Sequence, residues 1–137
     1  MDMMTEERTF VKVCEHAVKQ LPLGQCKREH SNVCSYRINA NADDLSRCFI
    51  GALIQDEHYN RKFEGTGVDA QTLFLALFNS GVPAHLESVQ IMLGDLQSIH
   101  DNNSPKDWCR LLNEYANDRG WDTPLCMLEQ LDKERKE

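Results

Sequence analysis

The chain has 137 residues and a formal net charge of −7, with 41% hydrophobic and 27% charged residues. This length fits one domain with its own core, and the composition is that of a globular protein rather than a disordered one. No stretch approaches the roughly 20 apolar residues of a membrane helix, and the acidic start of the chain does not resemble a signal peptide. We therefore expect one domain, residues 1–137, located in the cytoplasm and without membrane contact.

The first helix is predicted to begin at Thr5, a residue type that caps helices, and to end at Pro22 and Gly24. Between these limits, Phe10 and Cys14 belong to an apolar row with helical spacing.

Residues 25–54 do not follow one clear pattern. A short β-hairpin near residues 35–50 is one interpretation, in which Ser35–Ile38 pairs with Arg47–Ile50. The apolar run Cys48–Ile54 also fits a buried helix, and we favour a helix start within it. The choice between strand and helix for residues 35–54 stays open.

Four further helical patterns follow a loop over Asp56–Gly67. Breaks at Gly81–Pro83, Asp101–Asn103 and Gly120–Pro124 separate them. Ser104 is expected to cap the helix that Pro105 begins. The side chains expected to face a core are Leu73, Phe74, Leu77 and Phe78, then Leu86, Val89, Leu93, Leu96 and His100, then Trp108, Leu111, Leu112 and Tyr115, then Leu125, Leu128 and Leu131. The sequence thus predicts a mainly α domain of five or six helices, with residues 132–137 as a frayed tail.

Two stretches of the chain resemble an uncharacterised family of small phage and prophage proteins. The first contains Cys34-Ser35-Tyr36-Arg37, then Cys48-Phe49-Ile50-Gly51-Ala52-Leu53-Ile54, and then Asp56, Tyr59 and Glu64-Gly65. The second is Leu96-Gln97-Ser98-Ile99-His100-Asp101. The resemblance implies a phage setting and, with it, an infected host cell. It implies no activity.

A cysteine nucleophile is the sharpest enzyme hypothesis. Cys48 would lie at the start of a helix, where the dipole lowers a thiol pKa. His58 or His100 would then serve as the base, oriented by Asp56 or Asp101. A buried, unreactive Cys48 is the simpler interpretation, because its neighbours are apolar. His100 fits the apolar row of its helix as a hydrogen-bonded core histidine.

A metal site is the second chemical hypothesis. Cys26, His30 and Cys34 follow a C-x3-H-x3-C spacing, and Cys48 is a candidate fourth ligand for Zn²⁺. Structural zinc sites usually pair their ligands more closely, so we expect no metal and no other cofactor.

The acidic charge is concentrated in the second half of the chain. Residues 69–137 carry 6 basic and 12 acidic groups, and no Lys or Arg occurs between Phe63 and Pro105. Binding to nucleic acid needs a basic patch, so direct contact is disfavoured and a basic protein partner is expected. The candidate contact residues are Glu64, Asp69, Glu87, Asp95, Asp101 and Trp121.

Two classes of function remain. The first is a small acidic interaction module, encoded by a phage, that binds and modulates or inhibits a host protein such as a nucleic-acid-binding defence factor. The second is a small cysteine-dependent enzyme centred on Cys48. The absence of an assembled catalytic motif favours the first, and the sequence leaves homo-oligomerisation open.

Overall fold

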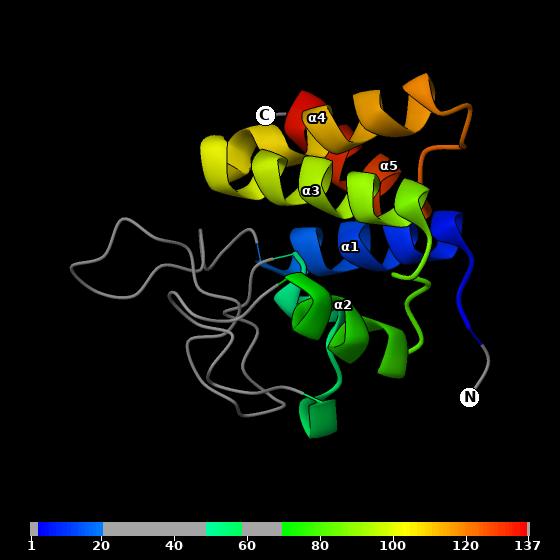
Figure 1. Cartoon of the computed structure of the whole chain (residues 1–137). Coiled ribbons are helices and arrows are strands. Elements are labelled where there is room, and N and C mark those ends of the chain that lie inside the picture. Colours follow the sequence, from blue (N-terminus) through cyan, green and yellow to red (C-terminus); the bar gives the residue numbers. More distant parts are fainter. Residues whose placement is uncertain (1–2, 21–48, 59–69, 137) are drawn as a thin grey trace.

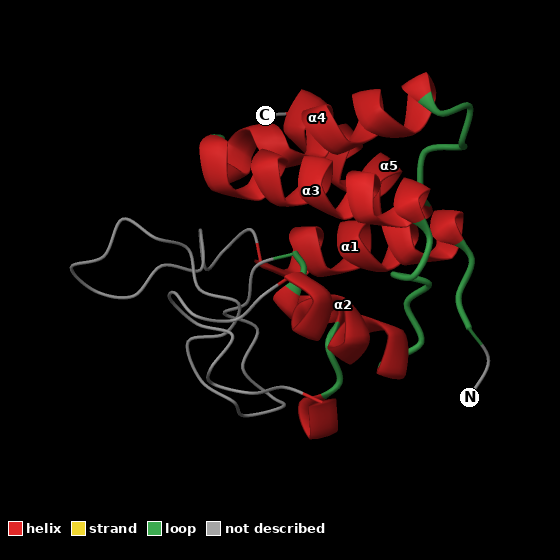
Figure 2. Cartoon of the chain, viewed as in Figure 1, coloured by secondary structure: helices red, strands yellow, loops and turns green. Residues whose placement is uncertain are grey.

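The computed structural model describes residues 3–20, 49–58 and 70–136, and no strand occurs among these residues (Figures 1 and 2). Their elements are five α-helices and two single-turn 3₁₀-helices. In chain order these are α1 (Glu6–Gln20), η2 (Gly51–Leu53), η3 (Asp56–His58), α2 (Ala70–Asn79), α3 (Glu87–Asn102), α4 (Pro105–Asp118) and α5 (Leu125–Lys136). The predicted mainly α fold with five or six helices is confirmed.

The hairpin proposed near residues 35–50 lies outside the described residues, except for Phe49 and Ile50. These two residues form a turn that leads into η2. The Leu53 amide donates a hydrogen bond to the Ile50 carbonyl over 3.0 Å, which closes the 3₁₀ turn. In the described part of the run Cys48–Ile54, the chain is therefore helical over one turn and then extended at Ile54.

The helix ends follow the local chemistry of the sequence. The Thr5 hydroxyl accepts a hydrogen bond from the Arg8 amide at 3.0 Å, which caps α1. Gly81 and Gly120 have φ angles of 92° and 75°, a conformation in which a Cβ would be strained. Pro105 begins α4 as expected, although the Ser104 side chain makes no capping hydrogen bond. The predicted frayed tail is helical in the structure as far as Lys136.

The core is centred on α1. This helix packs against α4, α5 and η2, and α4 also packs against α3 and α5. In Figure 1, α2 lies on the opposite side of α1 from α4. The largest fully buried side chains are Trp108, Phe10, Phe49, Ile54, Leu77, Met92, Leu93, Leu96, Leu112, Met127 and His100. A core drawn from η2 and all five α-helices indicates that the described helices form one compact domain.

The predicted buried face of α5 is wrong. Leu125 and Leu128 are 72% and 50% exposed, whereas Met127 is 0% exposed. Residues three apart are rotated by about 300° around a helix, so the row from Leu125 to Leu131 winds away from any one face. Only Leu131, at the end of that row, packs against the core.

Two further residues expected in the core are exposed. Phe78 in α2 and Leu86 before α3 are 40% and 45% exposed. Leu73 and Phe74 are half-buried against the core, and Leu111 in α4 is also half-buried. The segment Leu73–Phe78 is apolar on every side of its helix, so burial of Ala76 and Leu77 leaves the other side chains toward solvent. Leu75 and Phe78 of α2 are thereby left at the surface, around a hollow that Gln90 of α3 also lines.

None of the helices in the described part of the chain is both long enough and apolar enough to cross a membrane.

Candidate interaction site

A groove runs between α2 and α3. One hollow of about 430 Å³ is lined by Leu73 and Phe74 from α2 and by Leu93 and Gly94 from α3. A second hollow, of about 360 Å³, shares Phe74 and Gln90 with the first and extends to Leu75 and Phe78. Because the two hollows share residues from both helices, they form one continuous depression, here called the α2–α3 groove.

Exposed apolar side chains lie in and beside this groove. Leu75 is 58% exposed and Phe78 is 40% exposed, and both line the second hollow. Ile91 on α3 is 54% exposed, and Leu86 precedes that helix. Single exposed apolar residues are ordinary, but a group of large ones beside a groove is typical of a protein-binding surface.

The charges along the groove side of α3 are acidic. Glu87, Gly94 and Asp101 are seven residues apart, and this spacing places them on nearly the same side of the helix. Gly94 and Asp101 both line the groove, and Glu87 precedes Gln90 by about one turn. Asp95 faces the other way: its Oδ2 accepts a hydrogen bond from the Tyr115 hydroxyl of α4 at 3.2 Å. Of the acidic residues predicted on α3, Asp101 therefore lines the groove, and Glu87 lies on the same side of the helix about one turn before the groove begins.

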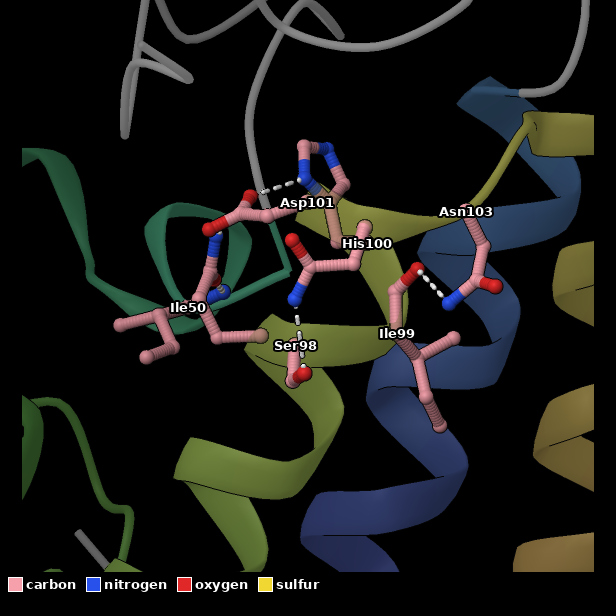
Figure 3. Close-up of polar contacts among 8 residues, drawn as sticks. Ile50, Ser98, Ile99, His100, Asp101 and Asn103 are labelled. Carbon is pink, nitrogen blue, oxygen red and sulfur yellow. Dashed lines mark hydrogen bonds and ion pairs between the residues drawn. The ribbon is translucent and has the colours of Figure 1, made fainter.

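A hydrogen-bonded network lies at one end of the groove. Nδ1 of His100 and Oδ1 of Asp101 are 2.8 Å apart, and the Gln97 amide group donates to the same Oδ1 at 2.8 Å. Oε1 of Gln97 accepts the backbone N–H of Ile50 at 3.3 Å. Figure 3 shows His100 and Asp101 at the end of α3 with Ile50 beside them. The network connects the C-terminal part of α3 to the turn before η2.

His100 is part of a buried aromatic cluster. Its ring is 0% exposed and stacks on Trp108 with 5.0 Å between ring centroids. Phe49 meets both rings edge-on, at 4.9 Å and 5.0 Å. Such geometry stabilises the packing of aromatic rings beyond their buried area alone. The sequence predicted that His100 is a core histidine hydrogen-bonded to Asp101. In the structure His100 is buried and bonded to Asp101, as predicted.

Most of the other candidate residues for catalysis or metal binding lie in parts of the chain that the structure does not describe. Cys26, His30, Cys34 and Cys48 lie outside the described residues. His58 is in η3, with Nε2 3.7 Å from Oε1 of its neighbour Glu57. Within residues 3–20, 49–58 and 70–136, no three His, Cys, Asp or Glu side chains are grouped so as to hold a metal ion.

The thiols of Cys14 and Cys126 are not activated. Cys14 and Cys109 are buried, and Cys126 is half-buried. Burial raises the pKa of Cys14 far above its usual range, and neighbouring Cys126 and Cys109 raise it further. Burial also raises the pKa of Cys126. A thiol with a raised pKa is a poor nucleophile at neutral pH, because little thiolate is present.

Trp121 lies away from the groove. It is half-buried where α4 and α5 connect, with its ring 5.3 Å from that of Phe10 and the Arg119 guanidinium 5.6 Å from its centroid. It is more exposed than Trp108, as the sequence indicated, but it is partly buried against the core. The acidic candidates Glu64 and Asp69 lie outside the described residues.

The sequence interpretation did not identify Leu75, Phe78, Leu86 or Gly94 as surface residues of a site. A signal for the first two was present, since a helix that is apolar all round either lies wholly inside a protein or exposes one face. The signal for Gly94 was a glycine in the middle of a helical pattern, where alanine is more stable.

Comparisons of the chain with protein-family models, curated proteins and solved structures found no match. Function must therefore be inferred from the site itself.

Proposed function

We propose that this protein is a small acidic interaction module, whose α2–α3 groove binds an apolar, positively charged segment of another protein. The observation that carries the proposal is the groove itself. It combines exposed Leu75 and Phe78 with a helix side that bears Glu87 and Asp101. Burial of the apolar side chains provides affinity, and the acidic residues favour a partner of opposite charge.

The charge distribution also favours a particular class of partner. Residues 64–104 contain five acidic groups and no Lys or Arg. A surface with this charge attracts proteins that present basic patches, and nucleic-acid-binding proteins have such patches by necessity. The proposed role is therefore that of a phage-encoded protein that binds a host nucleic-acid-binding protein, such as a defence factor, and inhibits it.

The phage assignment comes from the sequence resemblance alone. The two stretches that resemble phage proteins are far apart in sequence but meet in the fold, where Ile50 bonds to Gln97 and Phe49 packs on His100.

The experiment is photo-crosslinking in bacterial host cells from a reactive residue placed at Leu75. The matched control position is Leu128, the same residue type with similar exposure, 50% against 58%, on a different helix. A discrete adduct with a host protein is expected from position 75 and not from position 128. The adduct should weaken with Glu87→Lys, which reverses a groove charge, more than with Asp95→Lys, which makes the same charge change on the side facing α4. Equal adducts from both positions, or none from position 75, would reject the proposal.

The alternative is a cysteine-dependent enzyme centred on Cys48. One observation favours it: the His100–Asp101 pair has the 2.8 Å hydrogen bond of an oriented base, and Phe49, next to Cys48 in the sequence, contacts that histidine. The complete burial of His100 between aromatic rings argues against it, because a catalytic base must reach its substrate. Rapid alkylation of Cys48 at neutral pH, lost in His100→Gln, would favour the enzyme over the interaction module.

A further inference from the structure

Gly94 lies in the middle of α3 with no structural reason to be glycine. Among the described residues, the glycines with a positive φ are Gly81 and Gly120. Gly94 does not adopt that conformation, so its backbone does not require glycine. A Cβ built on Gly94 meets no atom within 4 Å, so packing inside the protein does not require its absence. Alanine at such a position would make the helix more stable. Packing within the described fold therefore does not account for this glycine.

The position of Gly94 in the groove supplies a reason for it. Gly94 and Ser98 are one turn apart, both are exposed, and both line the larger hollow. Two small residues four apart leave a notch in the surface of a helix, and a second helix can approach its backbone closely there. The groove residues of α3 extend from Gln90 to Asn102, which at about 1.5 Å per residue is about 18 Å. This length matches three to four turns of a bound helix.

Charge determines which helix fits. Glu87 and Asp101 lie seven residues to either side of Gly94 and on the same side of α3. If a second copy of this chain bound there across a two-fold axis, the carboxylates of one copy would face those of the other. Such like-charge contacts are unfavourable. A helix with Lys or Arg near its two ends would instead place a cation near each carboxylate.

We infer that the α2–α3 groove binds an amphipathic α-helix of a partner protein, with its backbone crossing close to α3 at Gly94 and basic residues toward Glu87 and Asp101. The inference rests on the proposed function and specifies the structural class of the bound segment. Apolar residues of the helix would contact Phe74 and Leu75, and a small residue would face Gly94.

The test uses a designed peptide of about 18 residues, long enough to span the groove as a helix. It carries leucine along one face, alanine at the centre of that face and lysine at both ends. A control peptide has glutamate in place of every lysine. Binding is followed by isothermal titration and by amide chemical shifts of the full chain. The lysine peptide should bind and shift α2 and α3 signals, and the glutamate peptide should not.

Substitutions at the notch then test the close approach. Gly94→Leu should weaken binding of the lysine peptide at least about tenfold without lowering thermal stability, because leucine fills the notch and its Cβ meets no atom within 4 Å in the unbound protein. Asn117→Leu, at an exposed position of α4, is the matched control and should leave binding unchanged. Absence of binding by the lysine peptide, or equal binding by Gly94→Leu, would overturn the inference.

Three other outcomes would also overturn it. Self-association of the wild type in sedimentation equilibrium, abolished by Gly94→Leu, would assign the groove to a second copy of the chain. A marked loss of thermal stability in Gly94→Leu would mean that part of the same chain occupies the notch. A crosslinked host protein from position 75 that survives Gly94→Leu would leave the proposed function standing while refuting the bound helix.

Discussion

The backbone N–H of Ile50 donates a hydrogen bond to Oε1 of Gln97, 47 residues further along the chain. The same Gln97 donates through Nε2 to Asp101, which in turn is bonded to the buried His100. One side chain thus joins the turn before η2 to the end of α3. Because Leu93 and Gly94 precede this junction on the same helix, the network also fixes one end of the α2–α3 groove.

The first prediction concerns this junction. Gln97→Ala removes both hydrogen bonds of the side chain and leaves the amide of Ile50, a buried residue, without this acceptor. The expected loss in free energy of unfolding is about 1–3 kcal/mol. The control is Ser98→Ala on the next residue, which removes only an exposed hydrogen bond from Asn102 and should cost less than about 0.5 kcal/mol. Urea denaturation measures both. Equal stability of the two variants would mean that Gln97 does not hold the turn.

The second prediction tests the orientation of α5. Met127 is fully buried and its neighbour Leu128 is half exposed. Met127→Ala should lower the free energy of unfolding by about 2–5 kcal/mol, because it leaves a cavity in the core. Leu128→Ala should cost less than about 0.5 kcal/mol. A larger loss of stability for Leu128→Ala than for Met127→Ala in denaturation curves would mean that the buried face of α5 is the one the sequence suggested.

The helix ends were predictable because they depend on local chemistry. Thr5, Pro105 and Gly120 act through hydrogen bonding or backbone angles that each residue imposes on its own neighbourhood. The core position of His100 was also predictable, since it continues the apolar row of α3 and is followed by an acceptor, Asp101.

The buried faces of α2 and α5 were less predictable because several apolar rows compete on each helix. In α5, leucines at spacing three suggested one face, and the contacts of Met127 with the rest of the core selected another. In α2, nearly every side is apolar, so only the position of neighbouring helices decides that Leu77 is inside and Leu75 outside. The groove is lined by side chains of both α2 and α3. It could therefore not be predicted from either segment of the sequence alone.

The third prediction concerns thiol reactivity. Cys126 is half-buried while Cys14 and Cys109 are buried, so iodoacetamide should modify Cys126 before the other two in the native protein. Burial and then Glu15 raise the pKa of Cys126, so its rate of modification should still be increasing as the pH passes its usual range. Peptide mass spectrometry after timed quenching gives the three rates.

A pair of charge variants checks the cause of that shift. Glu15→Gln should speed modification of Cys126, since it removes a negative charge that disfavours the thiolate. Glu114→Gln, an exposed position in α4 that does not affect this thiol, should leave the rate unchanged. Faster reaction of Cys14 than of Cys126 would contradict the packing of α1 against α5.

The last prediction concerns Tyr115 at high pH. Burial raises the pKa of its hydroxyl to about 12; Arg119 opposes this shift, and the Asp95 carboxylate beside the hydroxyl adds to it. The folded state therefore holds this proton more tightly than the unfolded state does. The resulting stability is present below about pH 10 and is lost as the pH rises through about 12.

Two measurements follow for Tyr115. Tyr115→Phe lacks this pH-dependent contribution, so the stability difference between wild type and variant should shrink as the pH rises from about 10 to about 12. In an absorbance titration of phenolate, Asp95→Asn should lower the pKa of Tyr115, because the carboxylate that accepts its hydrogen bond is gone. The control is Asp118→Asn, at an exposed position on the same helix as Tyr115, and it should leave the pKa of Tyr115 unchanged. A stability difference that is constant with pH would show that Tyr115 ionises equally in the folded and unfolded chain, and that the contact between α3 and α4 at Asp95 does not form in solution.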